Sequence, residues 1–223
     1  MKISKLLPIA LAMALGTSGV FAAGGTDTTN SAVSTFNLTL ADYVKITTDA
    51  QSKTSTTTYT TDYKGIRIDT AMAVTFKIIS NNREEEFYLI GTCPVAGGAD
   101  ATEKALYGAN ADCTRANLVF TKTDNPPADT SVSDITGGTP TLANNTDAVA
   151  FGMTIAPSHA EGATESPLTA EWDTDYSAIK YTMKNGVGTF LCTINGNNVA
   201  NTFDTHDTDG TYQAKLTMTR TAF

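Results

Sequence analysis

Apolar and polar residues alternate along most of the chain, in short runs separated by residues typical of turns. The clearest run is 71–80, where Val74, Phe76 and Ile78 share one face and polar residues lie between them. A period of two residues is that of a β-strand with one buried face. Because such runs recur and no long helical period appears, we predict an all-β, antiparallel fold, either a sandwich or a barrel. Strands are predicted at 32–40, 43–47, 66–68, 71–80, 86–92, 117–123, 148–156, 178–183, 187–194 and 211–219.

The residues between these runs predict how the strands connect. A polar turn at 81–83 separates two apolar runs and indicates a hairpin. Asn185 and Gly186 favour a type I′ hairpin between the next pair of runs, since both central positions of that turn need positive φ. The best helix candidate is 100–107, and it is about two turns long. Residues 124–146 and 157–167 are rich in turn formers, which predicts surface loops.

The first 22 residues have the three parts of a secretory signal peptide. Residues 1–5 contain two lysines and form a short basic start, and residues 6–15 are apolar except for Pro8. Ala22 then provides a small residue for cleavage. The apolar part is too short for a stable membrane anchor, and no later stretch is apolar for long enough to be one. We therefore expect an exported protein, at the cell surface or in the periplasm or extracellular space, without a transmembrane anchor.

Composition supports one extracytoplasmic β-domain. Removing 1–22 leaves about 200 residues, enough for a single large domain. Residues 23–33 form a polar, flexible extension, and 34–223 are expected to form the domain. The chain contains about 40 threonines, a residue that suits strands with one solvated face. The net charge of −8 repels nucleic acid and anionic lipid, so we exclude both as partners.

The three cysteines fit an oxidising compartment. Cys93 and Cys113 flank a loop rich in small and polar residues, and we predict a disulfide between them. Cys192 alternates with Phe190 and Ile194 on one strand face, which predicts a buried free thiol. The spacings match no zinc motif, and we expect no metal or other cofactor.

Few residues suggest catalysis, and we expect that the protein is not an enzyme. His159 and His206 lie in polar segments predicted to be solvated loops. No nucleophile elbow, zinc-protease motif or phosphate-binding loop is present in the predicted mature chain. Paired carboxylates support glycoside hydrolysis in some folds, but a solvated acidic loop is the simpler interpretation here. The carboxylates concerned are Glu165, Glu171, Asp173 and Asp175.

Two binding functions remain as alternatives. Trp172, Tyr176 and Tyr181 are candidate stacking platforms for a carbohydrate ligand. Residues 204–210 begin like a calcium-binding loop, but the later positions lack oxygen ligands. We prefer a structural interpretation of this end, in which Gly210 and Tyr212 form a tyrosine corner. In such a corner the tyrosine hydroxyl bonds back to the upstream backbone.

The two ends of the chain resemble bacterial fimbrial subunits, particularly the major pilins of the chaperone–usher type. The resemblance rests on the short alternating segment 34–46 and on the Gly-x-Tyr-x-Ala-x-Leu-x-Met pattern of 210–219. It implies an incomplete Ig-like antiparallel β-sandwich, completed by strand exchange with a neighbouring subunit. Pilins of this type commonly bridge two early strands with a disulfide, whereas the bridge predicted here closes a central loop.

The resemblance also implies partners and assembly residues. The partners are copies of the chain or related subunits, a periplasmic chaperone and the outer-membrane assembly machinery. The same N-terminal segment equally suits a strand internal to its own domain. The function implied is that of an exported structural or adhesive surface protein. The donor-strand residues would be Ala32, Ser34, Phe36, Leu38 and Leu40.

Overall fold

The structure, a computed structural model, divides the chain into two units, 1–40 and 41–223. It describes residues 38, 40–61, 65–97, 101–128, 130, 142, 147–161, 164–165, 168–200, 202–203 and 207–220. The predicted signal peptide at 1–22 and the predicted extension at 23–33 lie outside these residues. The fold below is that of the second unit.

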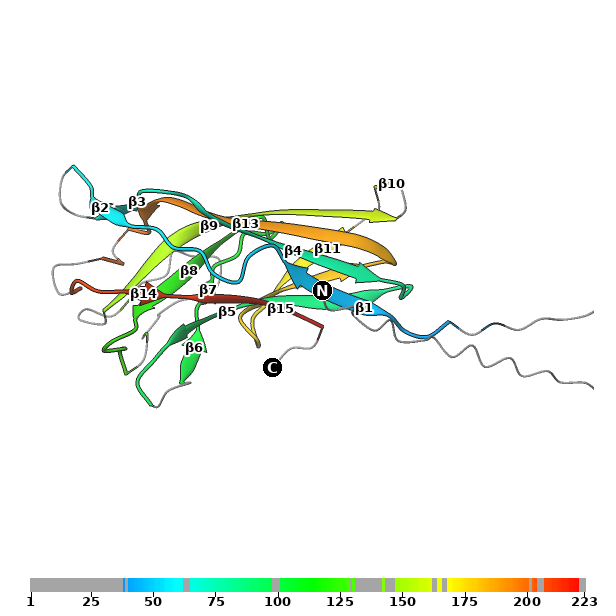
Figure 1. The fold of residues 1–223 in the computed structure, drawn as a ribbon, viewed down its shortest axis with the longest axis horizontal. Helices are drawn as coiled ribbons and strands as arrows, with labels where there is room; N and C mark the ends of the chain where they lie inside the picture. The colour runs from blue at the N-terminus through cyan, green and yellow to red at the C-terminus, as the bar shows by residue number, and fades with distance from the viewer. Residues whose placement is uncertain are drawn as a thin grey trace, which may run out of the picture. The chain divides into compact units, whose positions relative to one another are not determined.

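The domain consists of two antiparallel sheets, and the described residues contain no helix, which confirms the predicted all-β sandwich (Figure 1). None of these residues forms a helix able to cross a membrane. The path of the large sheet is β1 (Val44–Thr48), β4 (Met72–Ser80), β13 (Gly186–Asn198), β9 (Ala148–Glu161), β8 (Arg115–Lys122) and β14 (Tyr212–Gln213). Short strands extend it: β2 (Thr57–Tyr59), β3 (Ile66–Ile68), β7 (Leu106–Tyr107) and β10 (Thr164–Glu165). The small sheet contains β11 (Leu168–Asp173), β12 (Ala178–Met183), β5 (Glu85–Pro94), β15 (Lys215–Thr219) and β6 (Thr102–Lys104).

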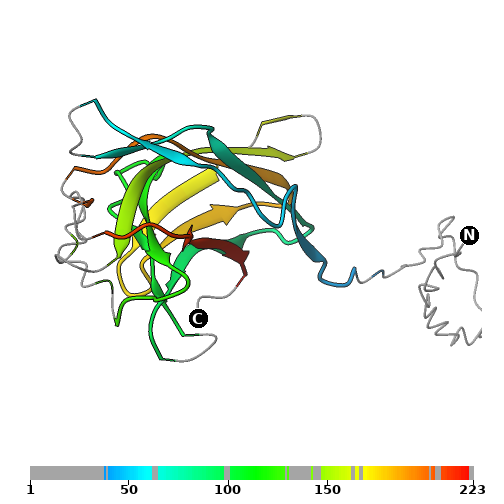
Figure 2. The same ribbon diagram turned by 60° about the vertical axis from the view of Figure 1, so that its left-hand side comes forward.

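The core lies between the inner faces of these sheets (Figure 2). Phe190 of the large sheet and Tyr181 of the small sheet are fully buried, and their ring centroids are 4.6 Å apart. Phe87 and Leu89 on β5 are fully buried, as is Ile78 on β4. These side chains occupy alternate strand positions, as predicted for strands with one buried face. Their burial removes a large apolar area from water, which is the main force holding the sheets together.

The sheets meet most closely at Gly91, on β5. The Ala105 amide donates a hydrogen bond to the Gly91 carbonyl at 2.9 Å, and the Val119 amide donates to the Ala105 carbonyl at 2.8 Å. Ala105 therefore connects the small sheet to β8 of the large sheet. A β-carbon on Gly91 would lie 2.9 Å from the β-carbon of Leu106, closer than packed side chains allow. Glycine is needed here for the close approach of the two sheets.

Both predicted hairpins are wrong, because the chain changes sheet at each turn. The residues at 81–83 join β4 of the large sheet to β5 of the small sheet, and Asn185 joins β12 to β13 in the same way. A type I′ turn needs positive φ at both central positions. Gly186 has a φ of 134°, but Asn185 is not among the residues with positive φ. Asn185 and Gly186 therefore lead the chain from the small sheet to the large sheet.

Three further predictions need correction. Residues 100–107, the helix candidate, contain β6 and β7, which pair with β5 and β8. The predicted loop at 157–167 begins inside β9, which continues through Pro157 to Glu161. The last predicted strand is two strands, because the chain leaves the large sheet after β14 and joins the small sheet at β15. In each case pairing with a distant strand outweighs the local preference.

The predicted Cys93–Cys113 disulfide is not formed, and all three cysteines are free and buried. Cys93 precedes Pro94, whose carbonyl accepts a hydrogen bond from Thr121 near the end of β8. Cys113 comes just before β8 begins, and the stretch 115–121 spans about 20 Å of extended chain. A disulfide needs α-carbons within about 7 Å. Burial raises the pKa of the Cys93 thiol to about 12, so this thiol is unreactive at neutral pH.

Replacing Gly91 with alanine should destabilise the domain, because the new methyl group would overlap Leu106 and Leu118. Overpacking of this kind costs about 1–3 kcal/mol. Thermal unfolding followed by circular dichroism should show a lower Tm. Gly152→Ala is the matched control, since a β-carbon there meets nothing within 4 Å. Equal Tm values for the two variants would contradict the close approach at Gly91.

Candidate functional site

Each sheet ends in a short edge strand, and one contact links the two edge strands. β1 ends the order of the large sheet and β15 ends that of the small sheet. Among the described strands, none pairs with the outer side of either one. The strands are linked where Arg220, which follows β15, meets Asp42, which precedes β1. Edge strands of this kind present backbone donors and acceptors to an added strand.

Apolar side chains of these edge strands pack against the core, and part of their surface stays accessible to solvent. Val44 and Ile46 on β1 and Leu216 on β15 pack against the core while remaining partly exposed. Met218, also on β15, is buried. An added strand with apolar residues at alternate positions would therefore gain both backbone hydrogen bonds and apolar contacts.

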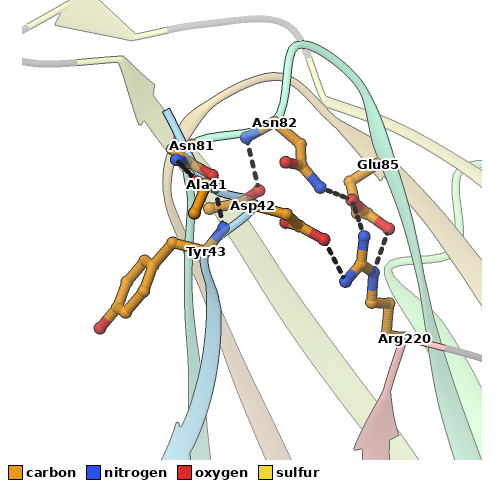
Figure 3. Close-up of polar contacts among 8 residues, drawn as sticks. Ala41, Asp42, Tyr43, Asn81, Asn82, Glu85 and Arg220 are labelled. Atoms are coloured by element: carbon orange, nitrogen blue, oxygen red, sulfur yellow. Dashed lines mark hydrogen bonds and ion pairs between the residues drawn. The ribbon is translucent and has the colours of Figure 1, made fainter. Parts of the chain in front are cut away.

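Asn81 holds the chain where it enters β1 (Figure 3). The Tyr43 amide donates to Asn81 Oδ1 at 2.7 Å, and Asn81 Nδ2 donates to the Ala41 carbonyl at 2.8 Å. The Asn81 amide also donates to the Tyr43 carbonyl at 3.1 Å. One side chain thus takes the place of a neighbouring strand for residues 41–43. The position from which the N-terminal segment leaves the domain is fixed at Ala41.

Arg220 joins three segments at the same end of the domain (Figure 3). Its Nη1 lies 2.8 Å from Asp42 Oδ2, while Nε and Nη2 contact the two carboxylate oxygens of Glu85. The Glu85 side chain is only 12% exposed and also accepts a hydrogen bond from Asn82. The hydrogen bond to Glu85 and then that to Asp42 raise the pKa of Arg220. We call Asp42, Glu85 and Arg220 the Arg220 clamp.

The N-terminal segment carries exposed apolar residues immediately before this anchored point. Leu38 is 75% exposed and Leu40 is 78% exposed, and neither lies in a strand. Apolar side chains that are exposed together on one segment are a common feature of protein–protein contact sites. The other predicted donor-strand residues, Ala32, Ser34 and Phe36, lie outside the described residues.

Tyr212 makes the contact expected of a tyrosine corner. Its hydroxyl donates to the Thr208 carbonyl at 2.8 Å and lies 3.2 Å from Asp147 Oδ1. The φ of Gly210 is 152°, and a β-carbon there would lie 2.6 Å from Lys122 Cε. Burial alone would raise the pKa of Asp147, but hydrogen bonds from Thr208 and Tyr212 outweigh it and lower that pKa. This network fixes the chain next to β14, at the point where β14 pairs with β8.

The three predicted aromatic platforms do not form one surface. Tyr181 is fully buried against Phe190, so its prediction as a ligand platform is wrong. Trp172 is half-buried on β11, and its indole Nε1 has no hydrogen-bond partner among the described residues. Tyr176 is exposed and packs edge-on against Tyr88, with ring centroids 6.2 Å apart. Alternation along β11 and β12 turns the Trp172 and Tyr181 rings toward the core.

The candidate acidic and histidine residues are also dispersed. Glu171 pairs with Lys180, while the Asp173 carboxylate accepts hydrogen bonds from the amides of Asp175 and Tyr176. His159 was expected in a solvated loop but is 5% exposed, because β9 continues through it. Glu165 lies in β10. No group of three metal-binding side chains occurs among the described residues. Of the candidate calcium segment 204–210, residues 204–206, which include His206, lie outside the described residues, and 207–210 form no helix or strand.

Sequence reasoning missed Asn81 and Glu85, at the connection from β4 to β5, and Arg220, which follows β15 and contacts Glu85. Asn81 was assigned only to a turn, and no spacing in the sequence links Glu85 to a residue 135 positions later. An arginine directly after an alternating terminal strand is a weak signal that points to no partner. Comparison with protein-family models, with curated proteins and with solved structures finds no match in any of the three.

Protonation of Asp147 in acid should lower the free energy of unfolding of the domain. Because its pKa is lowered on folding, its contribution is present above the unfolded pKa of about 4 and is lost as pH falls through the folded pKa. Asp147→Asn should therefore lose less unfolding free energy than the unmodified protein between about pH 6 and about pH 3. Urea unfolding at each pH measures this. Asp209→Asn, at an exposed carboxylate, is the control and should follow the unmodified protein.

Proposed function

We propose that the mature protein is an exported structural subunit that assembles at the cell surface by β-strand pairing. The apolar segment before Ala41 of one copy would add a strand to an edge of the next copy. The observation that carries this proposal is the exposure of Leu38 and Leu40 directly before an anchored chain exit. Edge strands with incomplete apolar cover in the same domain support it.

The lengths of the proposed donor and acceptor agree. Phe36, Leu38 and Leu40 alternate with polar residues over five positions, and β15 is also five residues long. Alternation would place the three apolar side chains on one face of the added strand. They would lie toward Leu216 and Met218, while the added backbone satisfies the outer groups of β15. Backbone pairing supplies affinity, and the alternate side chains supply specificity.

Assembly between copies is favoured over closure within one copy. Leu38 and Leu40 are exposed, and this exposure supports pairing with another copy. An unoccupied sheet edge favours premature aggregation, and so does an exposed apolar segment of alternating pattern. This supports the further expectation of a periplasmic chaperone and an outer-membrane assembly machinery, which would protect the edge until the next subunit arrives.

The alternative function, a secreted carbohydrate-binding module, has less support. Such a module needs aromatic rings exposed on one surface. Of the three candidate residues only Tyr176 is exposed, at 40%, and its ring already packs against Tyr88. Polymers formed by a protein that is silent on a glycan array would separate the two functions.

Charges on the apolar face of the donor segment should abolish assembly. Leu38→Asp with Leu40→Asp places two carboxylates where the proposed strand contacts the core of its neighbour. The mature protein should form SDS-resistant ladders in unboiled gels and filaments in negative-stain micrographs, and this variant should give monomers with an unchanged Tm.

The matched control is Asn37→Asp with Thr39→Asp, which adds the same charge to the opposite face of the same segment. This control should still assemble. The proposal fails if the unmodified protein remains monomeric, or if both double variants assemble equally well. A lowered Tm in the leucine variant alone would instead indicate a strand internal to the domain.

A further inference from the structure

We infer that the Arg220 clamp acts as a stop that sets the register of the strand added to β15. This inference rests on the proposed function and names its partner, the segment 36–40 of a second copy. The clamp joins the beginning of β1 to the end of β15, through the 2.8 Å contact between Asp42 Oδ2 and Arg220 Nη1. A strand added along β15 would meet this contact at its end.

The outer edge of β15 is limited at both ends of the strand. At its beginning, Ala214 separates β15 from β14, which belongs to the large sheet and pairs with β8. At its other end stands Arg220, directly after Thr219. Five residues lie between these limits, a length of about 17 Å for an extended chain. Without a limit, a strand with apolar residues at every second position can shift by two residues and keep the same face inward.

The clamp is built to resist displacement. Arg220 meets Glu85 through two parallel contacts, a geometry that fixes the guanidinium plane as well as its charge. Glu85 lies at the start of β5, is mostly buried and is further held by Asn82. A strand advancing past β15 would have to separate Arg220 from Asp42 and leave their charges less well paired. A shift in register by two residues therefore carries a cost that the apolar alternation alone does not impose.

A fixed register would also fix the spacing of subunits. In the donor copy only Ala41 separates Leu40 from Asp42, and the Ala41 carbonyl is held by Asn81. The proposed donor strand is therefore adjacent in sequence to the anchored start of its own domain. When its end is set by the clamp of the acceptor, the distance between successive domains follows from the same contact.

The test maps register directly in the full mature protein. A photoreactive benzoylphenylalanine replaces Leu38, the chains are assembled and irradiated, and mass spectrometry locates the cross-linked acceptor residue. We expect one dominant site on β15 in the otherwise unmodified protein. In Arg220→Gln the cross-link should move by two residues toward position 220 or divide between two sites, while polymers still form.

Two variants keep the result interpretable. Lys215→Gln removes a cation from the opposite end of β15, outside the clamp, and should leave the cross-link in place. Asp42→Asn weakens only the contact between the edge strands, leaves the Glu85 pair intact, and should shift the register even if Arg220→Gln does not fold.

The outcomes are distinguishable. A cross-link that stays in place in polymers of folded Arg220→Gln or Asp42→Asn would overturn the stop but not strand exchange. Absence of any cross-link between copies of the unmodified protein would overturn the proposed function and the stop together. An equal shift in Lys215→Gln would also overturn the assignment, since loss of any nearby charge would then have the same effect.

Discussion

Ala105 is hydrogen-bonded to both sheets, and the rest of the structure depends on this contact because it determines where the sandwich is closed. Its amide bonds to Gly91 on β5, and its carbonyl accepts from Val119 on β8. Such an approach is possible only because Gly91 has no side chain. The large sheet therefore meets the small one through β6 and β7 on one side of β5. On the other side of β5 lies β15, with which the order of the small sheet ends.

This asymmetry separates the stabilising part of the domain from the part proposed to bind a partner. The closed part contains the fully buried side chains of β5 and β12, together with the tyrosine corner that fixes β14 against β8. Near the edges formed by β1 and β15, apolar residues such as Ile46 and Leu216 keep part of their surface exposed. A domain whose core is already held on one side can leave an edge unoccupied without unfolding, which is what assembly by strand addition requires.

The Arg220 clamp illustrates how polar contacts define position rather than supply most of the stability. The pair of Arg220 and Asp42, whose side chains are about half exposed, contributes little to the free energy of folding, whereas Glu85 is mostly buried and needs its partner. Their geometry is nevertheless specific: Arg220 connects the chain before β1, the start of β5 and the end of β15. Together with Asn81, it gives the N-terminal segment a defined point of departure at Ala41. A fixed departure point matters more for a repeating assembly than a small gain in the stability of one subunit.

The sequence by itself determined the type of fold and the buried face of most strands. Alternation in β4, with Phe76 and Ile78 buried, depends only on the geometry of an extended chain and on the cost of exposing apolar groups. The sequence also indicated Tyr212 as a corner residue, and its hydroxyl makes the expected contact with the Thr208 carbonyl. The donor role of Leu38 and Leu40 follows from the resemblance to pilins and stays a prediction. Sequence reasoning failed where the outcome depends on which strands are neighbours. Local propensity predicted hairpins at 81–83 and at Asn185, a helix at 100–107 and a disulfide at Cys93, whereas pairing between distant strands determines the structure at each of these places.

Tertiary structure alone brought Asp42, Glu85 and Arg220 together, because a contact between residues so far apart in the chain follows from how two sheets pack and leaves no periodic trace in the sequence.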